Sequence, residues 1–297
     1  MIALGSFEEE FRPLYAFDLE DTGPTIGWQP AWSPDGHRIA AITSPRQGEF
    51  WVVVVSVADR KLLSKHRLPE GILKLPNHLS PPNQFRWSPD GQKLLVSWEA
   101  VAVVDTESGS VQRLSEGPVV AEWAPDSSGV YYLEIANWDS PGKRAFGGFY
   151  FRKLGAEEAV EVMGAKQLVA AGLRWPLGLH YGIMSLSPSA TRLALVVGPT
   201  GDAAGTLLVY EPKPGEMLAL ERPARRYDTD GRIATLQWSP AEERLAVIMV
   251  GLTGSEGVQI QVLDLSSGEW KTVATVPLKL TVAGIEVLAF KNLSWTR

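Results

Sequence analysis

The chain has 297 residues, no cysteine and a formal net charge of −6 at pH 7. The lack of cysteine excludes disulfides, thiolate nucleophiles and thiolate metal sites, and the acidic balance argues against binding nucleic acid, whose phosphates attract basic surfaces. The longest apolar runs, such as residues 50–58, are far shorter than the roughly 18 residues of a membrane helix. We expect a soluble protein with no membrane span. Because the first residues show no signal peptide, it is cytoplasmic as written, or periplasmic or extracellular if a leader was omitted.

A short pattern recurs along the chain. It reads "AWSPDGHRIA" at 31–40 and "RWSPDGQKLL" at 86–95. Weaker copies begin at residues 122, 185 and 237, and the final "LSWTR" resembles the start of another copy. Within the pattern, proline presets φ at the second turn position, and glycine accepts the positive φ that closes a tight turn. Each copy is therefore predicted to be a turn between two strands.

Short β-like runs follow each turn in chain order. The runs expected as second strands are 38–44, 93–99, 129–135, 192–198 and 244–250. The runs expected as third strands are 50–57, 100–106, 147–154, 206–212 and 258–265, and fourth strands follow at, for example, 111–117 and 270–276. Four antiparallel strands per unit make the blade of a β-propeller, which buries both of its faces by stacking against neighbouring blades.

The residue at the head of each copy is expected to pack between neighbouring blades. These head residues are Trp32, Trp87, Trp123, Leu186, Trp238 and Trp295.

The spacing of the copies and the two chain ends give the predicted number of blades. Head residues lie 36 to 63 residues apart, so that no gap has room for an extra blade. A last blade can be shared, with its first strand from about 285–297 and its other strands from 1–27. We predict a single all-β domain over 1–297, a six-bladed β-propeller of four-stranded antiparallel blades. Its ring is closed by pairing N- and C-terminal strands, so that the two termini lie together.

The repeat at 32–36 and 87–91 resembles the TolB-like, or WD40-like (PD40), propeller repeats. The resemblance covers nearly the whole chain, with departures at Ala124, at Leu186 and in residues 239–243. Such repeats also form the propeller domains of prolyl-oligopeptidase-type peptidases and of tricorn protease. In the TolB family the propeller is a platform for protein partners. The resemblance therefore implies a protein or peptide partner for this chain.

Residues for catalysis or metal binding are scarce. The string nearest to a G-x-S-x-G nucleophile elbow, at 253–257, lacks the first glycine. The chain has four histidines and no metal-binding H-E-x-x-H motif. His37 and His66 are expected to be exposed, while His78 and His180 lie in long loops and could bind a metal only if the fold brings them together. We predict no catalytic residue, no metal and no cofactor. The alternative is a small-ligand-binding or metal-dependent enzyme, a hydrolase or lyase, with its site at the central channel.

The long loops are expected to emerge on one face of the propeller, where binding surfaces usually lie. They span residues 69–84, 134–148, 165–182 and 221–232. Trp, Tyr and Arg are enriched at interface hot spots. The candidate partner-binding residues in these loops are Trp138, Asp139, Lys143, Arg144, Arg174, Trp175, His180, Tyr181, Arg226, Tyr227 and Asp228. As an alternative, 157–178 could form a short helix or flap that plugs the channel and buries Trp175. The predicted function is a monomeric, non-enzymatic scaffold that binds a protein or peptide partner.

Overall fold

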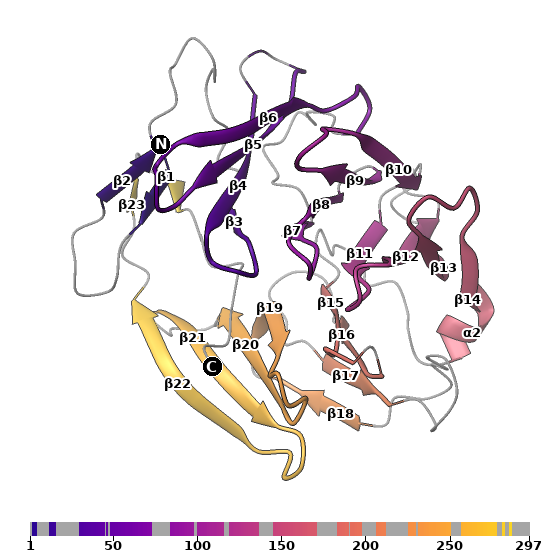
Figure 1. Ribbon diagram of the computed structural model, residues 1–297. Coiled ribbons are helices and arrows are strands. Elements are labelled where there is room, and N and C mark those ends of the chain that lie inside the picture. Colours follow the sequence, from indigo (N-terminus) through magenta and orange to yellow (C-terminus); the bar gives the residue numbers. More distant parts are fainter. Residues whose placement is uncertain are drawn as a thin grey trace. The chain divides into compact units, whose positions relative to one another are not determined.

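The computed structural model describes most of the chain (Figure 1). The described residues are 2–4, 12–15, 30–44, 46, 48–72, 84–97, 100–115, 119–136, 145–170, 183–189, 191–197, 206–211, 225–229, 231–250, 257–277, 281–282 and 285–286. The chain divides into two compact units, Met1–Ser127 and Ser128–Arg297. The boundary falls within the third of the sheets, between its first strand and the other three.

The described residues form five four-stranded antiparallel sheets, with the strands of each sheet in chain order. The first is β3 (Ala31–Trp32), β4 (Arg38–Thr43), β5 (Trp51–Ser56) and β6 (Leu62–Arg67). The second is β7 (Gln84–Trp87), β8 (Lys93–Ser97), β9 (Val101–Asp105) and β10 (Val111–Ser115). The third is β11 (Val119–Trp123), β12 (Gly129–Ala136), β13 (Ala145–Lys153) and β14 (Val160–Gly164). The fourth is β15 (Ile183–Leu186), β16 (Leu193–Val197), β17 (Thr206–Tyr210) and β18 (Arg225–Asp228). The fifth is β19 (Arg232–Trp238), β20 (Arg244–Val250), β21 (Gly257–Asp264) and β22 (Trp270–Pro277).

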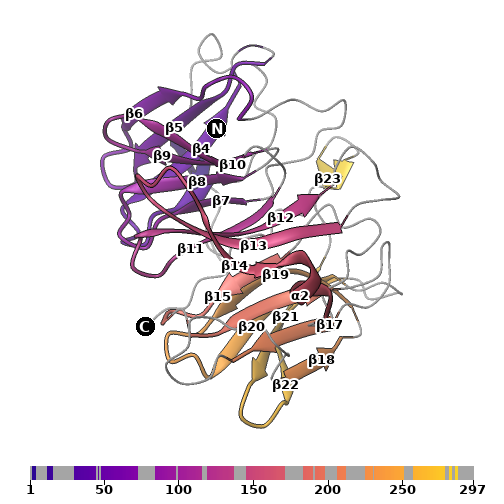
Figure 2. The same cartoon turned by 90° about the vertical axis from the view of Figure 1, so that its right-hand side faces the viewer.

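Three smaller elements complete the described part of the chain. β1 (Ile2–Leu4) pairs with β2 (Arg12–Tyr15), and β23 (Thr281–Val282) pairs with β24 (Ile285–Glu286), each as a two-stranded antiparallel sheet. The short helix α2 (Ala165–Ala170) follows β14 directly and lies against β13 and β14 (Figure 2). It falls inside the alternative helix or flap at 157–178, but the same span also contains strand β14. Trp175, which that segment was expected to bury, lies outside the described residues.

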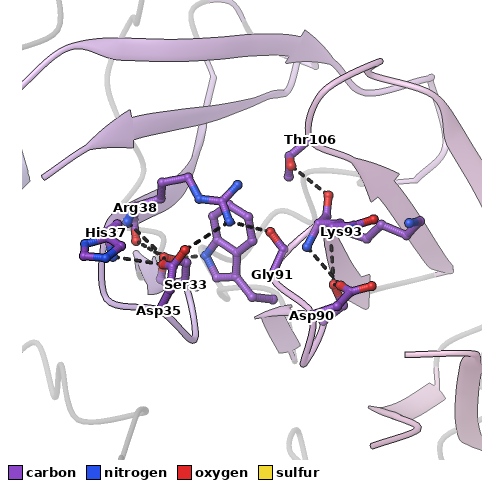
Figure 3. A network of polar contacts seen from close by, with 12 residues as sticks. Ser33, Asp35, His37, Arg38, Asp90, Gly91, Lys93 and Thr106 are labelled. Atoms are coloured by element: carbon purple, nitrogen blue, oxygen red, sulfur yellow. Dashed lines mark hydrogen bonds and ion pairs between the residues drawn. The ribbon is translucent and has the colours of Figure 1, made fainter. Parts of the chain in front are cut away.

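The repeated motif forms the predicted turn between the first and second strands. In the first sheet, the N–H of Gly36 donates to the carbonyl of Ser33, and the N–H of His37 donates to the Asp35 carboxylate. The Ser33 hydroxyl also accepts from the N–H of Arg38, which closes the turn from the other side (Figure 3). Gly36 has a φ of 72°, in the left-handed region that glycine adopts without strain. The serine, aspartate and glycine of the motif are therefore turn residues, as predicted.

Consecutive turns are fastened to each other by arginines at one repeat position. Arg38 donates from Nη2 to the carbonyl of Gly91 at 2.7 Å (Figure 3). The guanidinium of Arg38 also lies over the Trp87 ring, 4.8 Å from its centroid. The equivalent Arg192 of the second unit donates from Nη1 to the carbonyl of Glu242, also at 2.7 Å. Each arginine directly follows the turn between the first two strands of its own sheet, and it binds the equivalent turn of the following sheet.

Of the four head tryptophans that the structure describes, three pack against the preceding sheet and one does not. The indole N–H groups of Trp87, Trp123 and Trp238 donate to the backbone carbonyls of Ala31, Arg86 and Ser185, respectively. The three rings are between 1% and 6% exposed. In contrast, Trp32 is 45% exposed, so the expectation that it packs between blades is wrong for this residue. The physical reason is that no four-stranded sheet precedes β3 in the described part of the chain.

Apolar side chains fill the spaces between neighbouring sheets of each unit. In the first unit, Ile42 and Val54 of the first sheet share a buried cluster with Trp87 and Val96 of the second. In the second unit, Val209 of the fourth sheet joins a cluster with residues of the fifth that includes Trp238. Burial of both faces explains why the middle strands read as continuous aliphatic runs.

The prediction of six blades is wrong for the structure, which has five four-stranded sheets among its described residues. In the predicted shared blade (about 285–297 and 1–27), β1 and β2 pair as its second and third strands would. They form only a two-stranded sheet, whereas the prediction counted four strands there. The expected C-terminal strand around Trp295, the closure of the ring and the proximity of the termini lie outside the described residues.

Hydrogen bonds to aspartates within the turns should make the stability of the fold depend on pH in the acidic range. The pKa of Asp264 is lowered to about 2, mainly because the Ser266 hydroxyl donates to its carboxylate. Hydrogen bonds from Ser33 and from the N–H of Ser108 likewise lower the pKa values of Asp35 and Asp105. A lowered folded-state pKa contributes stability above the unfolded value of about 3.9, and this contribution is lost as pH falls further. We expect melting temperatures to fall between about pH 4 and about pH 2, with a smaller fall for Asp264→Asn. Equal falls in both proteins would contradict this assignment.

Candidate functional site

Three of the predicted partner-binding residues lie in the described part of the chain. Arg226, Tyr227 and Asp228 belong to β18, the outer strand of the fourth sheet. The other eight lie outside the described residues, within 137–144 and 171–182. They are Trp138, Asp139, Lys143, Arg144, Arg174, Trp175, His180 and Tyr181.

Alternation along β18 separates its residues into two faces. Arg226 and Asp228 are exposed, whereas Arg225 and Tyr227 are half-buried on the opposite face. Arg226 donates from Nε and Nη2 to Asp228 Oδ1 at 3.2 and 3.1 Å. Thr206 on β17 donates its hydroxyl to the same oxygen at 2.8 Å, and this bond is the main cause of the lowered pKa of Asp228. The outward face of β18 therefore presents a fixed, charged pair.

Tyr227 has a different role from its predicted neighbours in the site. Its ring meets the Trp270 ring edge-on at a centroid distance of 6.4 Å, next to the buried cluster between the fourth and fifth sheets. Burial is the main cause of its raised pKa. Tyr227 thus contributes to packing between sheets, and of the three described candidates Arg226 and Asp228 lie together on the exposed face.

A buried ion pair that we did not predict joins β7 of the second sheet to β11 of the third sheet, two strands of the first unit. Arg86 on β7 donates from Nη1 to Glu122 Oε2 on β11 at 2.6 Å. The side chains are 23% and 13% exposed. Burial raises the pKa of Glu122, and the nearby Arg86 partly opposes this rise. Perturbed carboxylates of this kind occur both at functional sites and in structural ion pairs.

The sequence holds a signal for this pair. Both residues directly precede a head tryptophan, so they occupy the same position in consecutive first strands. The residues at that position in the five sheets are Ala31, Arg86, Glu122, Ser185 and Gln237. A charged or polar residue in a strand whose neighbours are buried marks a special environment. The partner of each could not be read from sequence, because the pairing runs between separate sheets.

The two described histidines do not form a metal site. His37 is exposed, as predicted, beside the first turn. His66 is half-buried rather than exposed, and its Nε2 lies 3.0 Å from the carbonyl of Thr106 on the second sheet. Among the described residues, no group of three or more His, Asp or Glu side chains could hold a metal ion. His78 and His180 lie outside that part of the chain.

The one described helix is also far too short to cross a membrane, and no other described segment offers a membrane-spanning helix.

Solved structures resemble the chain in fold, with low sequence identity. No protein-family model and no curated protein matches it. Hydrazine synthase from Kuenenia stuttgartiensis aligns with a TM-score of 0.56 and 15% identity, over 86% of this chain and 68% of that one. A TolB from Agrobacterium tumefaciens aligns with a TM-score of 0.54 and 16% identity, over 84% of this chain and 81% of that one. The chain has a TolB-like β-propeller fold, and its described residues form five four-stranded blades.

A third solved structure is also similar in fold at low sequence identity. TolB from Acinetobacter baumannii aligns with a TM-score of 0.50 and 14% identity over 82% of this chain. The chain spans about half, 52%, of that protein's length. At such low identity the likeness extends to the propeller fold, and function has to be argued from the site itself.

Proposed function

We propose that this propeller is a non-enzymatic scaffold that binds a protein or peptide partner at the loop-bearing end of its third and fourth blades. The exposed pair on β18 carries the proposal. Arg226 and Asp228 are 65% and 72% exposed, yet three hydrogen bonds fix their geometry. A charged surface that is held in place before binding loses less side-chain entropy when a partner docks.

Two further segments of the sequence support the same proposal by their composition. Residues 137–144 stand between β12 and β13 of the third blade in the sequence and include Trp138 and Arg144. The segment 171–182 follows α2 and carries Arg174 and Trp175. Tryptophan and arginine are the residue types that most often dominate binding energy. The TolB-like fold adds a rigid support of the kind on which binding loops are usually displayed.

A photo-cross-linking amino acid placed at Arg226 tests this proposal. We expect a discrete cross-linked partner from position 226, and none from Thr272, an exposed control position on β22 of the fifth blade. The purified partner should bind the wild-type protein. Trp138→Ala with Arg144→Ala should abolish that binding, a loss of at least about 30-fold, with a nearly unchanged melting temperature. Identical cross-links from positions 226 and 272, or a variant that fails to fold, would contradict the proposed surface.

The Arg86–Glu122 pair supports a second candidate, a small-ligand-binding or metal-dependent enzyme. A half-buried guanidinium beside a carboxylate of raised pKa could orient a polar ligand. Thermal shifts with divalent metals, a chelator, and sugar and peptide panels separate the two candidates, since a ligand that binds the folded state raises its stability. Stabilisation by a metal or sugar that disappears in Glu122→Gln would favour the enzyme over the scaffold.

A further inference from the structure

The outer edge of the first blade carries a concentration of positive charge in a chain of net charge −6. Residues 60–67 contain four Lys or Arg residues and no Asp or Glu. Two neighbouring leucines in the same stretch are exposed, Leu62 by 39% and Leu63 by 52%. We call this surface the basic strip. It consists of Arg60, Lys61, Leu62, Leu63, Lys65 and Arg67.

The local geometry of β6 exposes the strip. β6 is the last strand in the order of its sheet, so one of its edges has no neighbouring strand among the described residues. Val54 pairs with Ser64 and Val55 pairs with Leu62, which leaves Leu63 as the extra residue of a β-bulge. A bulge at a sheet edge re-aims the side chains beside it. Both leucines therefore remain at the surface, although the neighbouring strand β5 is buried.

The strip is not a general feature of outer strands in this protein. β10, β14 and β22 each carry at most one Lys or Arg. β18 carries two arginines, but Asp228 offsets one of them through the ion pair described above. Lysines and a bulge on an edge strand also discourage pairing with a second copy of the same strand, because like charges would face each other. A second copy of this chain is therefore a poor occupant for the strip.

The groups around the strip are mainly hydrogen-bond donors. Lys65 Nζ lies 5.0 Å from the centre of the Trp51 ring, and the indole N–H of Trp51 is buried with no hydrogen-bond partner. Arg67 makes one exposed ion pair, with Glu49 at 3.4 Å. Exposed pairs of this kind are weak and exchange readily. A second carboxylate, Asp59 next to Arg60, already accepts a hydrogen bond from the Ser56 hydroxyl at 3.0 Å. The four Lys and Arg residues of the strip outnumber these two carboxylates, so the surface is complementary to a ligand rich in acceptors and negative charge.

We infer that the basic strip docks an acidic, extended polypeptide segment whose Asp and Glu residues alternate with apolar ones. The carboxylates would face the lysine and arginine side chains, and the apolar residues would cover Leu62 and Leu63. An extended segment can also hydrogen-bond to the free edge of β6, as in other cases of strand addition. This site lies on the first blade. It is separate from the partner surface proposed for the third and fourth blades.

Binding of a fluorescein-labelled peptide that alternates glutamate with valine and leucine tests the inference. We expect saturable binding to the full chain that weakens as salt rises, because screening acts on exposed charges. Arg60→Glu with Lys61→Glu should weaken binding by about tenfold or more, since like charges would then meet. Lys153→Glu with Lys166→Glu changes the net charge equally at exposed positions on β13 and α2, and should bind as the wild type does.

Three outcomes would overturn the inference. The first is the absence of saturable binding to the wild type when circular dichroism shows it folded. The second is equal weakening by both double variants, which would mean that only net charge matters. The third is preferential binding to phosphatidylserine vesicles over the acidic peptide, which would assign the strip to a lipid surface. Melting temperatures of both variants within about 3 °C of wild type ensure that binding, and not folding, is compared.

Discussion

Replacing Trp238 by alanine is expected to lower the free energy of unfolding by about 3 to 5 kcal/mol. The ring is 1% exposed and packs in the cluster between the fourth and fifth blades. Its indole N–H donates to the carbonyl of Ser185 at 3.0 Å. The substitution therefore leaves a cavity and an unpaired buried carbonyl, both of which cost stability. Urea denaturation followed by circular dichroism measures the change.

Trp32→Ala is the matched control for this prediction. Trp32 occupies the same repeat position but is 45% exposed. Its replacement should cost less than about 1 kcal/mol, in the range of surface substitutions. Equal losses for the two variants would mean that Trp32 is packed as fully as the other head residues. A small loss for Trp238→Ala would mean that the repeat is not what holds consecutive blades together.

The second large effect is expected from Arg86→Met, which should cost about 3 to 5 kcal/mol near pH 8. The substitution leaves the half-enclosed carboxylate of Glu122, 13% exposed, without the guanidinium 2.6 Å away. Burial already raises the pKa of Glu122, and loss of Arg86 removes an influence that opposes this rise. A raised folded-state pKa means that the folded protein binds the proton more tightly than the unfolded chain does.

The loss caused by Arg86→Met should therefore depend on pH in a defined direction. It is largest above the folded-state pKa, where Glu122 is ionised, and it shrinks as pH falls toward the unfolded value of about 4.3. Adding Glu122→Leu to Arg86→Met removes both charges and should recover much of the stability, as replacing a whole buried pair often does. A loss that stayed constant from pH 8 to pH 5, or a double variant as unstable as the single one, would rule out an uncompensated buried charge.

Local sequence signals predicted the motif turns and most strands correctly because the forces involved are local. The loop predicted at 221–232 is wrong in part, since Arg225–Asp228 form strand β18. The positive φ of Gly36 and the hydrogen bonds of Ser33 and Asp35 depend on residues within a few positions of each other. The packing of Trp87 and Trp238 was also predictable, since a large apolar residue at a repeated position needs a neighbour. Trp32 differs because its burial depends on a preceding sheet, which the repeat at its own position does not specify.

The number of blades and the orientation of the candidate binding residues could not be predicted from the repeats alone. The prediction of a sixth blade counted strand-like runs from both chain ends, of which β1 and β2 form a two-stranded sheet. Whether Tyr227 faces solvent or the next blade depends on the register of β18, because shifting a strand by one residue exchanges its two faces. The pairing of Arg86 with Glu122 joins different sheets, so that only the folded structure shows it.

Three buried head tryptophans, Trp87, Trp123 and Trp238, each join their blade to the blade before it, which leaves loops and edges free for binding. Hydrogen exchange of the indole N–H groups, followed by NMR after assignment by Trp→Phe variants, tests this most directly. Slow exchange is expected for Trp87, Trp123 and Trp238, whose indoles donate to backbone carbonyls. Trp32, at 45% exposure, should exchange rapidly. Rapid exchange of all four indoles, or protection of Trp32 equal to that of Trp238, would contradict the account.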